Sequence, residues 1–133
     1  MSGQRYRLLS FFFVLLLLLG ACSSPTPEEL ASLAAKGYYD HLLRREFDNF
    51  LAGKAMSDSL PEIYREQLKE GYKQFMAQQD KEHHGILSTR VVNAKADTSL
   101  HVMNVFLMLC FGDSTIEEIV VPMVDVNGSW RMK

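Results

Sequence analysis

The sequence is poor in cysteine and contains no cluster of basic residues. Its 133 residues include two cysteines, Cys22 and Cys110, which are too few for a disulfide framework, so packing must stabilise the fold. After residues 1–21, the chain carries 16 acidic and 12 basic residues, a net charge of −4 with neutral histidines. Because no Lys/Arg patch is present, we expect neither a nucleic-acid partner nor a basic surface for anionic lipids.

The longest apolar run, Leu8 to Ala21, is too short to span a membrane, since a spanning helix needs about 20 apolar residues. Arg5 and Arg7 precede this run, and small residues end it. A positive start, a short apolar core and a small-residue exit are typical of a secretory signal peptide. The pattern predicts that residues 1–21 are removed, and it argues against an uncleaved membrane anchor.

The end of this run, Leu19-Gly20-Ala21-Cys22, resembles the bacterial lipobox. The resemblance implies cleavage between Ala21 and Cys22 and a diacylglyceryl group on the Cys22 sulfur. In a soluble secreted protein, a cysteine at this position would be a coincidence. Several acyl chains, such as palmitate, give stable anchoring. Ser23 is not the aspartate linked to inner-membrane retention, so we expect an outer-membrane lipoprotein that faces the periplasm.

The remaining cysteine and the histidines form no recognisable catalytic or metal-binding motif. Cys110 lies in the apolar run 106–111, where we expect a buried, inert thiol. His83 and His84 would diverge by about 100° on a helix, and the His-Glu-x-x-His arrangement is absent. We interpret both histidines as solvated residues at a helix end, and we predict no metal or other cofactor.

Residues 22–27 are expected to form the lipidated cysteine and a flexible tether, and residues 28–133 a single domain. Thr26, Pro27 and Glu29 match the pattern of a capped helix start. The helix that follows has an apolar stripe made of Leu30, Leu33, Ala34, Gly37, Tyr38, His41 and Leu42. Gly37 lowers helix propensity, so we expect it to allow close packing against another element.

A short second helix is expected at about 46–52 and a long third helix up to about His84. Ser59 and Glu62 offer a cap for the long helix, and Gly85 is expected to end it in a left-handed conformation. The apolar stripe of the long helix is Ile63, Tyr64, Leu68, Gly71, Tyr72, Phe75 and Met76. The first half of the domain is therefore predicted to be helical.

After Gly85 the apolar period changes to two, which is typical of strands. We expect strands at 86–96, 100–111, 115–126 and 129–133, and Asn127-Gly128 is the strongest hairpin signal. Helices followed by an antiparallel meander predict an α+β fold, in which the N-terminal helices, including the long one, pack on one face of a curved antiparallel sheet of about four strands.

The second of these strands is apolar on both faces. One face carries Val102, Phe106, Met108 and Cys110, and the other carries Met103, Val105, Leu107, Leu109 and Phe111. A sheet covered on one side alternates apolar and polar residues instead. Either the sheet curls over to cover both faces, or a second copy of the protein pairs with it as a homodimer.

The order of elements and the ending Asn127-Gly128-Ser129-Trp130-Arg131-Met132 resemble small bacterial lipoproteins of the nuclear transport factor 2-like superfamily. The resemblance implies a cone-shaped, cystatin-like α+β domain with a strongly curved sheet. Such domains sometimes hold a ligand cavity and are often dimeric. Many have no assigned function.

Some members of this superfamily are isomerases or dehydratases that use an Asp or His base and Tyr donors. The residues able to line a comparable pocket here are Tyr38, His41, Tyr64, Tyr72, His101 and Asn104. Their spacing is not diagnostic, so we assign no catalytic residue. We expect a lipid-anchored, non-enzymatic binding or interaction module, and the alternative is a small-ligand carrier or an isomerase-type enzyme. A deep cavity with a buried carboxylate or histidine would favour the alternative.

Overall fold

The computed structural model describes residues 23–133, so the predicted signal peptide and Cys22 lie outside the described residues. The elements are α2 (Pro27–Leu43), α3 (Phe47–Ala52), η1 (Ser57–Ser59), α4 (Glu62–His83), β1 (Ile86–Asp97), β2 (Val102–Phe111), β3 (Ile116–Val126) and β4 (Ser129–Met132). The predicted α+β class is confirmed. Within residues 23–133, no helix combines the length and apolar character needed to cross a membrane.

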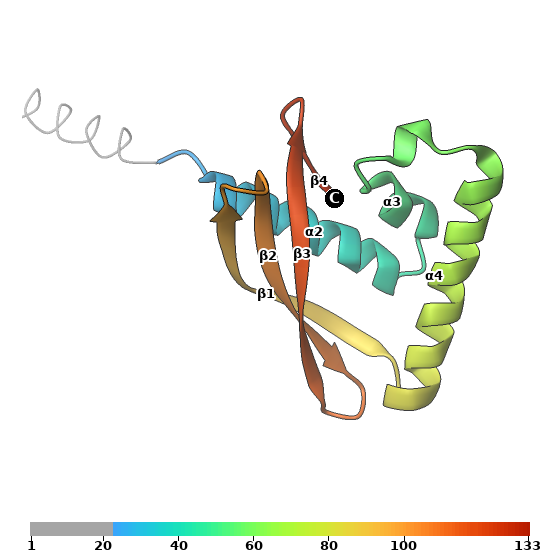
Figure 1. Ribbon diagram of the computed structural model, residues 1–133. Coiled ribbons are helices and arrows are strands. Elements are labelled where there is room, and N and C mark those ends of the chain that lie inside the picture. The colour runs from blue at the N-terminus through green and yellow to red at the C-terminus, as the bar shows by residue number, and fades with distance from the viewer. Residues whose placement is uncertain (1–22) are drawn as a thin grey trace, which may run out of the picture.

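The four strands form one antiparallel sheet in the order β1-β2-β3-β4, as the meander prediction requires (Figure 1). Asn127 and Gly128 connect β3 to β4, and both have positive φ angles, 53° and 86°. A two-residue hairpin turn with both φ angles positive matches the twist of the flanking strands and favours an Asn-Gly pair. The predicted hairpin is therefore confirmed.

Helix α2 packs on the inner face of the sheet and contacts all four strands (Figure 1). Its buried residues are Ala31, Ala35 and Leu42, and they meet Met103, Val105, Leu107, Leu109 and Phe111 of β2. Small alanine side chains let the helix approach the strands closely. All core residues in the described part lie between Ala31 and Met132, so the packing of this core is accounted for within residues 23–133.

The start of α2 is as predicted, and its predicted apolar stripe is buried only in part: Leu42 is buried, and Ala34 and Tyr38 pack against the core. The Thr26 hydroxyl accepts a hydrogen bond from the Glu29 N–H at 3.2 Å. Leu30 and Leu33, however, are 43% and 67% exposed. The expectation for Gly37 is also wrong, because a Cβ there would meet no atom within 4 Å. The helix turns Ala31 and Ala35 to the sheet, which places Leu30 and Leu33 outside.

Helix α4 stands apart from the strands, and α3 lies between it and α2 (Figure 1). Pro61 precedes it without a side-chain cap, so the predicted Ser59–Glu62 cap is wrong. The left-handed residue that ends α4 is His84, with a φ angle of 58°, so the helix cap lies one residue earlier than predicted. Gly85 follows and also has a positive φ angle, 84°. Met76 is the one buried residue of this helix.

The C-terminal end of α4 is fastened to the β2–β3 turn. His83 Nδ1 lies 2.9 Å from Asp113 Oδ2, and the His83 ring packs against Phe111 with 4.8 Å between centroids. The Asp113 N–H donates to the His83 carbonyl at 3.0 Å. Hydrogen bonds from the Thr115 hydroxyl and His83 lower the pKa of Asp113 to about 2. His83 is thus a helix-end residue whose side chain is 39% exposed and also pairs with Asp113, which the sequence did not predict; His84 is exposed.

Candidate functional site

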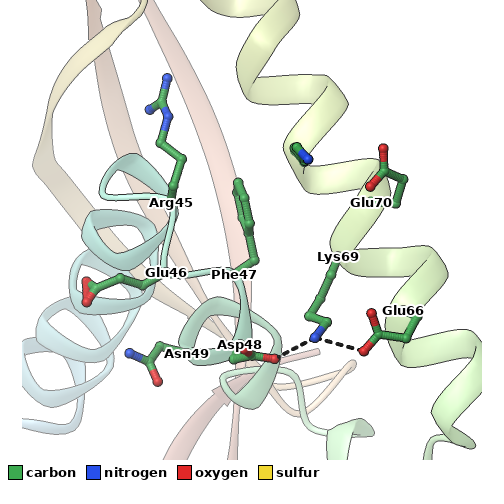
Figure 2. A pocket seen from close by; sticks show the side chains of 9 residues that line it. Arg45, Glu46, Phe47, Asp48, Asn49, Glu66, Lys69 and Glu70 are labelled. Carbon is green, nitrogen blue, oxygen red and sulfur yellow. Dashed lines mark ion pairs between the residues drawn. The ribbon is translucent and has the colours of Figure 1, made fainter.

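A groove of about 390 Å³ between α3 and α4 is lined mainly by charged side chains (Figure 2). Lys69 Nζ lies 3.0 Å from Asp48 Oδ1 and 2.9 Å from Glu66 Oε1, as the dashed lines show. Asp48 and Glu66 are largely exposed. Because these charges already pair with one another in contact with water, the groove is better explained as a link between the two helices than as a ligand site.

A second cavity, of about 370 Å³, lies between α4, the α2–α3 region and the inner face of the sheet. It is lined by Tyr39, Leu42, Phe50, Lys54, Tyr72, Phe75, Gln79, Leu109, Phe111, Glu117 and Ile119. Most of these side chains are aromatic or aliphatic. The volume and the apolar lining with a few polar groups match those of small-molecule binding sites, so this cavity is the candidate site.

Helix α4 is tied to the rest of the domain at both ends, and ion pairs with Asp48 and Arg45 hold it along its length. At the N-terminal end the Arg65 guanidinium donates to the Ser57 carbonyl at 2.6 Å. At the other end His83 pairs with Asp113. Between these ties, Tyr72, Phe75 and Gln79 follow at helical spacing and line the cavity from one side of α4.

Three aromatic rings form a rigid wall of the cavity. The Phe50 ring meets Tyr39 edge-to-face at 5.4 Å between centroids and Tyr72 at 4.9 Å. Such edge-to-face contacts are favourable beyond the burial of area. Burial raises the pKa of both tyrosine hydroxyls, and the nearby Tyr72 raises that of Tyr39 further. Both hydroxyls therefore stay protonated and can donate hydrogen bonds at neutral pH.

Lys54 is the cationic residue of the cavity lining. Its ammonium lies 5.6 Å from the centroid of the Phe50 ring, within cation–π range. The side chain is partly buried, and burial lowers the pKa of Lys54. None of the ion pairs among residues 23–133 involves Lys54. The cavity thus has a fixed positive charge that the described residues do not neutralise.

Comparison with known proteins supports the fold of this chain. No protein-family model matches the sequence, and no curated protein sequence matches it significantly. A crystal structure from Campylobacter jejuni, provisionally named an NTF2-like (nuclear transport factor 2-like) transpeptidase, is 9% identical and superposes with a TM-score of 0.59. The match covers 74% of this chain and 92% of that one. The fold is nuclear transport factor 2-like.

A solution structure from Rhodopseudomonas palustris is also similar. It belongs to a protein that contains a SEC-C motif, is 16% identical and has a TM-score of 0.51. The match covers 88% of this chain and 82% of that one. At such low identities both likenesses concern the fold alone, so the function of the nuclear transport factor 2-like domain must be argued from its own side chains.

Of the six residues predicted for a pocket, Tyr72 alone lines the cavity of this nuclear transport factor 2-like fold. The Tyr38 hydroxyl donates to the Trp130 carbonyl at 2.9 Å. His41 lies near the end of α2, with Nδ1 3.1 Å from Glu46 Oε1. Tyr64 is exposed.

The other two predicted pocket residues lie elsewhere in the sheet. His101 is exposed in the β1–β2 turn, where its φ is 53°. Asn104 pairs in register with Lys95 and Pro122, on the face of β2 opposite its buried residues. The structure therefore does not bring the six predicted residues together.

The cavity contains four important residues that the sequence did not single out for it: Tyr39, Phe50, Lys54 and Phe75. Phe50 and Phe75 carried an apolar signal for a helix face. Tyr39 stands next to Tyr38, and Lys54 lies after α3 in a loop without periodicity. No local pattern distinguishes Lys54 from a solvated lysine, so the signal for it is tertiary.

Cys110 is not buried as predicted. It is partly exposed on the outer face of β2, paired in register with Ser88 and Ile116. The odd-numbered residues from Met103 to Phe111 face the helices, and Cys110 has the opposite parity. Because side chains alternate along a strand, burial of the odd positions places the thiol outside.

Proposed function

We propose that this protein is a lipid-anchored binding module of the cell envelope, whose nuclear transport factor 2-like domain holds a small, largely apolar molecule in the cavity beneath α4. The observation that carries the proposal is the lining: a rigid aromatic wall of Tyr39, Phe50 and Tyr72 faces aliphatic side chains of the sheet. An apolar ligand would remove these surfaces from water at about 25 cal/mol per Å² of apolar area.

Binding without catalysis is favoured by the ionisable groups at the cavity. A general base must be a titratable group held where its environment can tune its pKa. The carboxylate of the lining belongs to Glu117, which is exposed, and among the described lining residues there is no histidine, serine or cysteine. In this proposal Lys54 and the two tyrosine hydroxyls bind the ligand, because the described lining offers neither a buried carboxylate nor a histidine, serine or cysteine for proton transfer or nucleophilic attack.

The proposed attachment is through a lipid on Cys22, at the outer membrane facing the periplasm. Ser23 to Thr26 are exposed, and the first described helix of the domain, α2, begins at Pro27. A short polar, proline-containing segment of this kind is an extended spacer. It would keep the domain and its cavity close to the membrane without burying either.

The cavity is tested with a neutral, environment-sensitive dye, N-phenyl-1-naphthylamine, and residues 23–133. Ile119 lines the cavity, whereas Val120, the next residue of β3, is 52% exposed on the other face. We expect wild type and Val120→Trp to bind the dye and Ile119→Trp to lose at least tenfold in affinity while still unfolding cooperatively. No dye binding by the wild type, or equal binding by both variants, would overturn the proposal.

A further inference from the structure

The position of Lys54 beside the cavity is fixed by the backbone on both sides. The Met132 N–H donates to the Gly53 carbonyl at 2.7 Å, and the Ala55 N–H donates to the Met132 carbonyl at 2.8 Å. Lys54 thereby forms a parallel bridge with Met132 of β4. The backbone of Lys54 is therefore held beside the cavity, and its side chain extends over the Phe50 ring.

The acidic residue of the lining lies at the other end of the sheet. Met132 pairs with Met123 of β3, which places Lys54 near that end of the strand. Glu117 precedes Met123 by six residues on the same face, a distance of about 20 Å along a strand. Between these ends the inner face carries Ile119 and its neighbour Leu109. The lining therefore combines one lysine and one exposed carboxylate, carried by different elements, with apolar side chains of the sheet.

Partly buried charges are usually paired, and the described residues supply no carboxylate for Lys54. We propose that the ligand supplies it: the cavity takes a monocarboxylate with an apolar body, such as a fatty or aryl-alkyl acid. The carboxylate pairs with the Lys54 ammonium, and the body lies against Ile119, Leu109 and the aromatic wall. This inference rests on the proposed function and names its ligand class.

Other charged ligands fit the lining less well. A cationic head group would be repelled by the ammonium of Lys54. The carboxylate that could pair with such a head group is Glu117, which is exposed to water, where an ion pair contributes little. A phosphate is usually held by arginine forks or several backbone N–H groups, and the lining offers one lysine. A single monovalent anion matches the charge that is present.

The test measures displacement of the neutral dye by decanoate and by decylammonium, which share an alkyl chain and differ in the sign of the head group. Wild-type protein at neutral pH should bind decanoate roughly tenfold or more tighter than decylammonium, as expected for a partly buried charged hydrogen bond. Lys54→Met should reduce this ratio to about twofold or less, each affinity being calculated with the dye affinity measured for that variant.

The matched control is Lys95→Met, which removes the same charge from an exposed position of β1 that pairs with Asn104 on the outer face. Its decanoate-to-decylammonium ratio should equal that of wild type, which separates a local pairing from the overall net charge. Two results would overturn the carboxylate inference and leave the cavity proposal standing. In one, the wild type binds the dye but binds decanoate and decylammonium equally; in the other, Lys54→Met keeps the wild-type preference for decanoate. If the wild type binds neither dye nor decanoate, both fail.

Discussion

The ring of Tyr38 packs directly against the backbone of Gly53, so closely that a Cβ at position 53 would lie 2.5 Å from Tyr38 Cδ1. The hydroxyl of the same tyrosine donates to the Trp130 carbonyl. Tyr38 therefore joins α2 both to the segment after α3 and to β4. Gly53 is followed by Lys54, so the same contact holds the backbone that positions the cavity lysine.

This contact predicts opposite effects for two glycine substitutions. Gly53→Ala should lower the free energy of unfolding by about 1–3 kcal/mol, because the packed ring must move away. Gly37→Ala should instead raise it by up to about 1 kcal/mol, because the helical position has open space and alanine is the better helix former. Urea denaturation of both variants measures the difference, and equal effects would show that the Tyr38–Gly53 contact is not tight.

The tie between α4 and the β2–β3 turn should depend on pH. Because the folded pKa of Asp113 is about 2, below its ordinary value of 3.8, its interactions stabilise the fold fully above about pH 4. This contribution is lost as the pH falls from 4 towards 2. The difference in unfolding free energy between wild type and Asp113→Asn should therefore shrink over that window. A difference that stays constant from pH 6 to pH 2 would contradict the assigned pKa.

The outer face of the sheet favours a homodimer with a second copy of the protein. Val120 and Ile116 are 52% and 61% exposed there. Arg90 and Glu118 flank Met108 on opposite sides in register. A two-fold axis that passes above Met108 parallel to β2 would bring the Arg90 of each copy towards the Glu118 of the other, so the face can be complementary in charge to itself.

Two neighbouring substitutions in β2 separate the faces. Phe106→Asp, on the outer face, should give a folded monomer by light scattering, and Val105→Asp, which buries a charge at a fully buried position, should unfold the domain. If residues 23–133 of the wild type are monomeric at high micromolar concentration, the homodimer prediction is wrong.

The lipobox resemblance predicts a covalent lipid on Cys22. Mass spectrometry of protein from membranes should find acylated Cys22 as the first residue, and Cys22→Ala should accumulate as unlipidated precursor. A mature N-terminus at another residue, without lipid, would remove the anchoring proposal and leave the cavity unaffected, since the described core begins at Ala31.

The amino-acid sequence by itself determined the order and type of the elements, because these depend on residues a few positions apart. Three such local features are present in the structure: the Thr26 cap, the change from helix to strand after Gly85, and the Asn127-Gly128 turn. Each depends on residues that are close together in the sequence. The order of helices and strands, together with the ending Asn127-Gly128-Ser129-Trp130, also carries the nuclear transport factor 2-like resemblance.

Only the tertiary structure decided which side chains meet at the cavity. A helix rotates by about 100° per residue, so α2 can direct Tyr38 or Tyr39 to a given neighbour, and the close approach of its alanines to the sheet decides between them. Lys54 reaches the cavity because residues 53–55 hydrogen-bond to β4, nearly eighty positions further along the chain. Contacts over such separations depend on how complete elements pack, and no local pattern of residue types records them.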